Sequence, residues 1–548
     1  MATSLLVGPG GGGSLGGEAS LLCAAIAAAA AVAVAWCAAR AVEWGLLRPR
    51  RLARALRAQG LRGTPYRPLA GDEPLAARLA REARSRPPLP LGCHDVVPRA
   101  MPLFHRAMEE HGKTSMTWYG PVPRVTISDP ELARQVLSNK FGHFEKVGFG
   151  QLGRLLHYGL STHEGEKWAR HRRIVTPAFH LDKLKRMLPA FASCCADLVG
   201  RWEGMASGGG GESCEVDVWP EMQRLTGDVI SRAAFGSSYL EGRRIFQLQE
   251  EQVQLAMLVA GKLHIPGYMM LPTRINRRMK RIAWEIEGIL GGMIAKREAA
   301  LRAGGEATAG DDLLGLMLES NMEQSSSGGP GMSTDDIIGE CKLFYFAGME
   351  TTSVLLTWTM VVLCMHPEWQ HRAREEVLRV FPGDGAAPDY DGLSRLKIVT
   401  MVLYEVLRLY TPVSAVRRRT YKPMELGGVR YPAGVMLVLP FLCIHHDRDV
   451  WGEDADEFRP ERFAEGIARA ASGPGGGGHP AALFAFGGGP RTCIGQSFAL
   501  LEAKMGLAMI LRSFELELSP SYSHAPFPLP LLRPEHGAQV KLTKRKLP

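Results

Sequence analysis

The chain has 548 residues, of which 46% are hydrophobic and 22% are charged, a balance that can bury a large core and excludes a disordered or fibrous protein. Lys and Arg outnumber Asp and Glu by 65 to 56, and the net charge of +9 suits an anionic membrane surface, a nucleic acid or an acidic protein partner. The ten cysteines are scattered without any C-x-x-C pair, so neither a zinc or dithiol motif nor a disulfide framework is expected.

An apolar segment near the N-terminus predicts a membrane anchor over residues 19–42, after a short tail of residues 1–18. From Ala19 to Ala39 the chain carries no charge, which matches the roughly 20 residues that span a bilayer as a helix. A cleaved signal peptide is the alternative. Arginines cluster directly after the segment, whereas the tail offers only Glu18, and this asymmetry favours a retained anchor with a cytosolic domain behind it.

Residues 43–90 are expected to form a basic linker that ends in a proline hinge. The stretch is rich in Ala and Arg, and Pro65 and Pro68 restrict both themselves and the residues before them. Gly/Ser-rich patches at 207–211, 325–331 and 472–478 have the composition of surface loops.

A long apolar helix is predicted from Ser333 or Thr334 to about Cys364. The acids Asp335 and Asp336 follow its start, where the helix dipole favours negative charge. Pro367 ends the helix, and residues 371–380 form a charged amphipathic helix. Short strands follow Pro412, notably at 435–440, so the fold class is expected to be mainly α with minor β.

The residues from Phe486 to Gly495 form a glycine-rich loop that holds Cys493 just before an apolar helical run at 497–511. A thiolate there would accept backbone N–H bonds and would feel the positive end of the following helix, and both effects favour the anion. An iron ligand requires this state. For such a loop taken alone, a tight turn with a buried cysteine is the alternative.

The loop resembles the haem loop of the cytochrome P450 family, Phe-x-x-Gly-x-Arg-x-Cys-x-Gly, at every fixed position. Four further family motifs occur earlier in the chain, in the order that the family has them. The resemblance therefore covers nearly the whole chain after the hinge. It implies one haem-binding catalytic domain over residues 91–548, in the cytochrome P450 fold with an N-terminal transmembrane helix. It also implies haem b as the cofactor, Cys493 as the thiolate ligand of the iron, and Phe486 and Gly495 beside it.

The resemblance implies further contacts to the haem propionates. Trp168 and Arg172, in the pattern Trp-Ala-Arg-His-Arg, and Arg491 match family positions that bind them. Trp and Arg are rich in hydrogen-bond donors, which suits carboxylates. Another contact is expected from Arg418 or Arg419, since the run of three arginines leaves the register open.

The hexapeptide Ala347-Gly-Met-Glu-Thr-Thr matches the oxygen-activation motif of the family. Gly348 weakens the helix, and a Thr hydroxyl can bond the Ala347 carbonyl and open a local groove. The resemblance then implies that Glu350 and Thr351 deliver protons as an acid and alcohol pair. For the hexapeptide alone, a capping or solvent-facing Glu is the alternative.

A buried triad of Glu405, Arg408 and Arg462 is implied by the motifs Glu-x-x-Arg and Phe-Arg-Pro-Glu-Arg-Phe. Its expected role is structural, beneath the haem. His445 and His446 beside Asp447 lack a third ligand at metal-site spacing, so packing is their expected role.

No flavin or iron–sulfur motif is visible, so electrons must come from another protein. The family's usual donor is an NADPH-dependent cytochrome P450 reductase with an acidic docking face. The other expected partners are a lipid bilayer and a small lipophilic substrate, with no nucleic acid. Substrate would contact residues by motif position: Phe346, Ala347, Ser414, Ala415 and Val416.

Finer resemblance, in residues 62–67, 458–470, 524–526 and 534–538, is to plant brassinosteroid-inactivating side-chain hydroxylases. It implies C-26 type hydroxylation by a single-pass protein of the endoplasmic reticulum. The pair Thr411-Pro412 departs from the Pro-Pro of many relatives and leaves substrate choice open. The alternatives are another plant steroid, a terpenoid or a fatty acid as substrate, a reductase-independent haem-thiolate isomerase or dehydratase, and a non-catalytic haem protein.

Overall fold

Helices carry most of the chain in the computed structural model, which describes residues 15–138, 144–147, 150–156, 158–208, 212–236, 239–262, 264–302, 312–383, 387–471 and 482–545. The helices are α1 Leu15–Val42, α2 Arg48–Arg57, α3 Glu73–Ser85, α4 Val97–Ala100, α5 Pro102–His111, α6 Pro130–Ser138, α7 Gly150–Leu156, α8 Gly165–Val175, α9 Leu181–Gly208, α10 Val218–Phe235, α11 Tyr239–Val259, α12 Arg274–Arg302, α13 Leu313–Ser326, α14 Thr334–Met365, α15 Pro367–Val380, α16 Tyr390–Arg395, α17 Lys397–Leu409, α18 Phe441–His445, α19 Arg448–Trp451 and α20 Gln496–Ser513. The strands are β1 Arg62–Gly63, β2 Thr114–Tyr119, β3 Val122–Ile127, β4 Phe144–Lys146, β5 Ser213–Asp217, β6 Val416–Thr420, β7 Met424–Leu426, β8 Val429–Tyr431, β9 Met436–Leu439, β10 Phe514–Leu518, β11 Pro526–Pro528, β12 Leu532–Pro534 and β13 Gln539–Lys544. The predicted class, mainly α with minor β, is confirmed.

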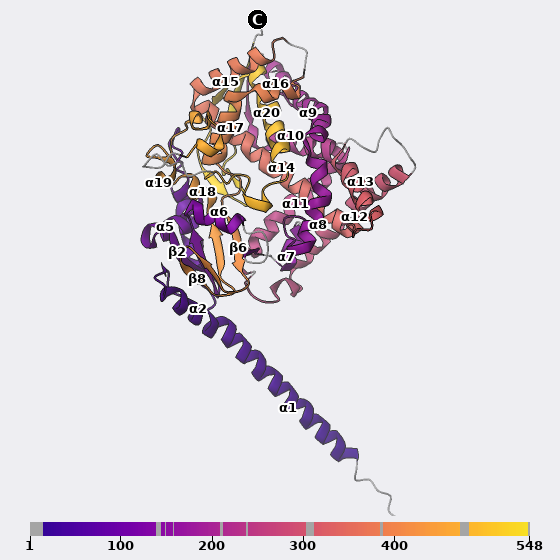
Figure 1. The fold of residues 1–548 in the computed structure, drawn as a ribbon, viewed down its shortest axis with the longest axis vertical. Helices are drawn as coiled ribbons and strands as arrows, with labels where there is room; N and C mark the ends of the chain where they lie inside the picture. Colours follow the sequence, from indigo (N-terminus) through magenta and orange to yellow (C-terminus); the bar gives the residue numbers. More distant parts are fainter. Residues whose placement is uncertain are drawn as a thin grey trace, which may run out of the picture.

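The 32-residue helix α14 runs through the middle of the helical body and packs against α10 and α20 (Figure 1). Its start is fixed by a capping box, in which the Ser333 hydroxyl accepts from the Asp336 N–H and the Asp336 carboxylate accepts from the Ser333 N–H. It ends at Met365, just before Pro367 opens α15. The predicted bounds of this helix are therefore confirmed.

Among the described residues, four sheets complete the body. The largest has the strand order β1-β2-β3-β9-β6-β4 and is mixed, because β1 and β2 pair in parallel, as do β3 and β9, whereas its other pairs are antiparallel. In its last pair, Lys146 of β4 lies opposite Arg418 of β6. Side chains of directly opposed residues share one face of a sheet, so these two cations lie on the same side.

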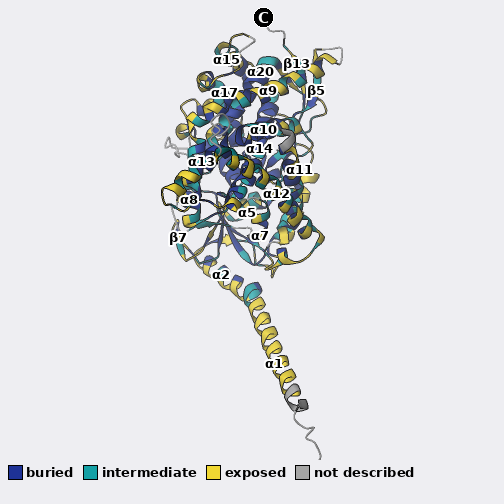
Figure 2. Cartoon of the chain, turned by 90° about the vertical axis from the view of Figure 1, so that its right-hand side faces the viewer, coloured by how far each residue is buried: buried dark blue, intermediate teal, exposed yellow. Residues whose placement is uncertain are grey.

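Helix α1 projects away from the body, and its described side chains are exposed along its length (Figures 1 and 2). Two helical stretches among the described residues are long and apolar enough to cross a membrane: Ser20–Arg57 and α14. The most apolar window of α14 is 72% buried, as befits a core helix, whereas that of Ser20–Arg57 is 0% buried. The N-terminal stretch is therefore the membrane-anchor candidate.

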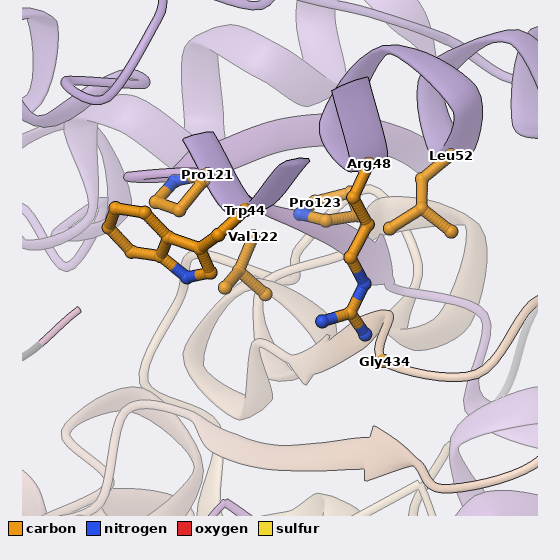
Figure 3. A pocket seen from close by; sticks show the side chains of 7 residues that line it. All are labelled: Trp44, Arg48, Leu52, Pro121, Val122, Pro123 and Gly434. Atoms are coloured by element: carbon orange, nitrogen blue, oxygen red, sulfur yellow. The ribbon is translucent and has the colours of Figure 1, made fainter. Parts of the chain in front are cut away.

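The segment expected to be a linker packs on the body instead. Leu56 of α2 is fully buried in the same cluster as the sheet residues, and β1 adds to the edge of the largest sheet. Figure 3 shows a small pocket at this junction, to which the N-terminal segment contributes Trp44, Arg48 and Leu52 and the body contributes Pro121, Val122, Pro123 and Gly434. These contacts extend the folded body N-terminal of residue 91, so the predicted linker over 43–90 needs correction: from α2 onward it is part of the fold.

Candidate active site

The cysteine loop adopts a conformation that requires glycine. Gly487 and Gly489 have φ angles of +75° and +65°, in the left-handed region that favours glycine. A Cβ on Gly489 would also lie 2.3 Å from the Leu137 carbonyl oxygen, so the loop packs directly on the end of α6. Gly495 then caps α20, which begins at Gln496 as the sequence predicts.

The Cys493 thiol, the expected iron ligand, sits in the closed turn of this loop. The Cys493 N–H donates to the Phe486 carbonyl at 2.9 Å and closes the loop. Burial raises the pKa of the thiol, while a hydrogen bond from the Gly495 backbone and the charge of Arg172 oppose that rise. The cysteine nevertheless keeps a large accessible fraction. Both observations hold together if the thiol borders a recess inside the fold, as a cofactor ligand would.

Cationic side chains converge next to this loop. The Arg491 guanidinium donates to the His163 carbonyl at 2.7 Å, pairs with Glu164 and lies 4.4 Å from the centre of the Trp168 ring. Arg172 donates to the Thr492 carbonyl at 3.1 Å. The four residues predicted from the two motifs, Trp168, Arg172, Arg491 and Cys493, are thus brought together.

The structure distinguishes the two arginines of β6. Arg418 is buried, and its pKa is lowered to about 10 by burial and then by the charge of Arg491. Arg419 points to the other face of the strand, is half exposed and pairs loosely with Glu145 at 3.9 Å. Arg418, and not Arg419, therefore belongs to the cationic cluster.

The sequence did not predict a role for Lys146 at this site. Its ammonium donates to the Ser161 carbonyl at 2.8 Å, and its pKa is lowered to about 7 by burial and by Arg491, Arg418 and Arg172, with Glu164 acting against them. A buried field of this sign favours an anionic group, and two carboxylates of a porphyrin beside the Cys493 thiol fit it. No local pattern marks Lys146, because β4 meets β6 only in the folded chain.

A matched pair of variants tests the register of β6. Arg418→Met is expected to weaken haem retention by ~10- to 100-fold, because a charge-assisted hydrogen bond contributes about 1.5–3 kcal/mol. Arg419→Met should change it little, since exposed ion pairs contribute roughly 0–1 kcal/mol. The measurement is the rate of haem transfer to an excess of apomyoglobin. Equal rates for the two variants would contradict the placement of Arg418.

The oxygen-motif segment of α14 shows the predicted local bond. The Thr351 hydroxyl donates to the Ala347 carbonyl at 2.7 Å. Gly348 lets α10 approach, since a Cβ there would lie 2.7 Å from the Ile230 side chain. Thr226 of α10 also donates to the Met349 carbonyl at 2.9 Å. The backbone of this turn is thus bonded by side chains as well as by the helix.

Glu350 is held between α14 and α10. Its carboxylate accepts a hydrogen bond from the Gln223 amide at 3.3 Å. Burial raises the pKa of Glu350 to about 7, against the opposing charge of Arg533. A carboxyl group with this pKa exists in both protonation states at neutral pH, which suits a group that gives and takes protons.

The expected triad forms in the core. Arg408 and Glu405 are fully buried and form a two-point ion pair at 2.7 and 2.8 Å. Arg462 approaches the same carboxylate at 3.4 Å, and Arg408 also donates to the carbonyls of His445 and Ala455. The triad thereby ties α17 to the segment that follows α19.

The neighbouring histidines His445 and His446 form hydrogen bonds within the fold. His445 Nε2 accepts from the Phe484 N–H at 2.9 Å, and His446 bonds Asp456 and the Leu409 carbonyl at 2.9 and 3.0 Å. His445 therefore holds the segment that leads into the cysteine loop, whereas His446 ties the end of α17 to Asp456.

The residues predicted to face substrate come from two parts of the chain. Phe346 and Ala347 lie on α14, whereas Ser414 and Ala415 directly precede β6 and Val416 begins it; all five are partly buried. The junction pocket of Figure 3 contains none of them and lies at the anchor end of the molecule.

Comparisons with known proteins agree with this geometry. The family model described as Cytochrome P450 matches residues 91–542. The chain is 57% identical to Cytochrome P450 CYP72A616 of Paris polyphylla over 94% of this chain and 98% of the relative. It is 48% identical to the 11-oxo-beta-amyrin 30-oxidase of Glycyrrhiza uralensis, with 91% and 94% covered, and 47% identical to the 7-deoxyloganic acid hydroxylase of Catharanthus roseus, with 92% and 96% covered.

The fold is shared with a solved structure, the retinoic acid-bound cyanobacterial CYP120A1, at a TM-score of 0.69 and 23% identity, with 84% of this chain and 100% of that chain covered. The family model spans most of the chain and the relatives match nearly end to end. This protein belongs to the cytochrome P450 family: it is a monooxygenase that takes haem b, a lipophilic substrate and electrons from a redox partner.

Proposed function

We propose that the protein hydroxylates an unactivated carbon of a polycyclic plant isoprenoid, with the brassinosteroid side chain, C-26 type, as the first candidate substrate and hormone inactivation as the result. The brassinosteroid candidate rests on the tail and hinge motifs of the sequence. A triterpenoid is the second candidate, favoured by the likeness to an 11-oxo-beta-amyrin 30-oxidase. The partly buried, mostly apolar residues on α14 and at 414–416 suit either ligand.

In this proposal the chain holds haem through the residues that converge on the cysteine loop. Cys493 would supply the thiolate, with Phe486 and Gly495 shaping its loop, and the propionates would be held by a group of cations and one indole donor. The indole is that of Trp168, and the cations are Arg172, Arg418, Arg491 and Lys146. When bound, the haem supplies the oxygen and one-electron chemistry that no side chain here can provide.

The residues of α14 would move protons. Thr351 Oγ1 is anchored to the Ala347 carbonyl, which fixes the position of its hydroxyl. Glu350 has a pKa of about 7, so it can take a proton from solvent and pass it on through an ordered water. The two side chains are neighbours in sequence and differ in chemistry, one an acid and the other a positioned alcohol.

Thr351→Ala is expected to keep the haem spectrum but to lower product formed per NADPH consumed by ~100-fold, the lower end of the range for general-acid catalysis. Thr359→Ala is the matched control, because its hydroxyl makes the same bond, at 2.7 Å to the Leu355 carbonyl, two turns along α14. The measurements are NADPH oxidation, hydrogen peroxide and product. Full coupling in Thr351→Ala would refute the proton-delivery role.

The proposed electron donor is an NADPH-dependent cytochrome P450 reductase, and the proposed site is the endoplasmic reticulum membrane, with a single span and the catalytic domain in the cytosol. The support is the net charge of +9, the exposed apolar helix α1 and the arginines of α2 directly behind it. We propose no nucleic-acid partner.

The test of substrate and reaction class is a reconstituted assay with reductase, NADPH and a panel of brassinosteroids, triterpenes and fatty acids, read by product mass. A gain of one oxygen on a brassinosteroid supports the first candidate, and the same gain on a triterpene alone favours the second. Conversion of a lipid peroxide without NADPH or oxygen would instead reveal the isomerase or dehydratase class, which the Glu350 and Thr351 pair makes the weaker alternative.

A further inference from the structure

A second group of ligand-type side chains lies away from the cysteine. His163, His171 and Asp336 each offer one donor atom, and the three atoms lie within 4.8 Å of one another. All three residues are buried, with the histidines 6% and 0% exposed. The Nε2 atoms of both histidines have no hydrogen-bond partner, although buried polar atoms normally have one.

The surroundings of His171 are those of a metal-binding histidine. Its Nδ1 lies 2.6 Å from a carboxylate oxygen of Glu340, which is itself fully buried and also accepts from the Leu160 N–H. If Nδ1 donates to Glu340, Nε2 presents a lone pair toward Asp336, whose nearer oxygen is 3.8 Å away. A carboxylate behind a histidine is the usual support for a metal ligand.

The remaining groups leave a donor free on each side chain. Lys167 binds one oxygen of Asp336, and the Ser333 N–H at 3.3 Å lies on the other, which keeps further acceptor capacity. Donors on one tetrahedral zinc lie about 3.4 Å apart, so small side-chain rotations suffice to close the set.

We propose that His163, His171 and Asp336 form a zinc site, with Glu340 as the positioning carboxylate. Two imidazole nitrogens and one carboxylate oxygen are the donor set of many protein-bound Zn²⁺ ions, and water completes four ligands. The three side chains come from the segment before α8, from α8 itself and from the first turn of α14.

A cation here would brace the haem-binding region from outside. The His163 carbonyl accepts from Arg491, α8 carries Trp168 and Arg172, and α14 carries the proton-delivery pair. The competing arrangement is an imidazolium at His171 that bridges Glu340 and Asp336 without any metal. The two differ in one respect that can be measured directly, the uptake of zinc.

The experiment uses the full-length haem-loaded protein in detergent, stripped with a chelator and then dialysed against Zn²⁺. Zinc and iron are measured together by mass spectrometry. One tightly bound zinc per haem is expected in the wild type and in His180→Gln, a control at an exposed histidine. His163→Gln and Asp336→Asn should lose at least ~100-fold in zinc affinity, and Glu340→Gln ~10- to 100-fold, with the haem spectrum unchanged. Zinc uptake by the wild type no greater than by Asp336→Asn would overturn the proposal.

X-ray absorption at the zinc edge of the wild type gives a second test that needs no variant to fold. Two imidazoles with oxygen ligands at about 2.0–2.2 Å are expected. A sulfur ligand in that spectrum would place the metal elsewhere and sink the assignment. Neither result depends on turnover, so the zinc site can fail while the proposed hydroxylase function stands.

Discussion

Replacing Cys493 with alanine is expected to abolish the thiolate-type spectrum of the reduced carbon monoxide complex, and with it all product formation. The sulfur is the one group of the loop that could bind the haem iron as an anion. Burial raises the pKa of this thiol above its ordinary value, and the Gly495 backbone and Arg172 offset only part of that rise. Bonding to iron would therefore be what makes the sulfur an anion. The measurement is a difference spectrum of the purified full-length protein.

Cys443→Ala is the matched control. This thiol is buried, lies in α18 and contacts the Met101 sulfur at 3.9 Å. Burial raises the pKa of Cys443 to about 12, so it stays a thiol. The control should lose stability of about 1 kcal/mol and keep both spectrum and activity. A thiolate-type spectrum that survives in Cys493→Ala would remove the basis of the proposed active site.

The parts of the site that lie in one stretch of chain could be predicted from sequence. Ser333 and Asp336 alone predict the start of α14, because a capping box involves only residues three positions apart. The glycines around Cys493 likewise predict a tight loop before a helix. The hydrogen bond from Thr351 to the Ala347 carbonyl follows from helical spacing. Each of these features depends on residues fewer than about ten positions apart.

Features that depend on distant pairing could not be predicted. Which arginine of β6 faces inward is decided by its pairing with β4 and β9, since a shift by one residue exchanges the two faces of a strand. The contribution of Lys146 depends on the same pairing across about 270 residues of chain. The packing of α2 on the sheet depends on the burial of Leu56. The Ala-, Arg- and Pro-rich composition of this segment does not show that burial.

The substitution Glu405→Gln is expected to cost about 3–5 kcal/mol of unfolding free energy, as is typical when one partner of a buried ion pair is removed. Glutamine keeps the shape but not the charge, so Arg408 would remain fully buried with only carbonyl partners such as Ala455. Arg462 would lose the same carboxylate at 3.4 Å. The variant should therefore yield little haem-loaded protein, and urea unfolding followed by tryptophan fluorescence measures the loss.

The control is Glu461→Gln, the same change of side chain in the segment that carries Arg462. Glu461 is half exposed and pairs with Arg372 at 3.3 Å, so its loss should cost no more than about 1 kcal/mol. Because both variants replace Glu with Gln, the difference between their free energies of unfolding measures the effect of burying the ion pair. If Glu405→Gln unfolded at the same urea concentration as Glu461→Gln, the carboxylate would not be compensating a buried charge. The tie between α17 and the segment after α19 would then rest on the carbonyl contacts of Arg408 alone.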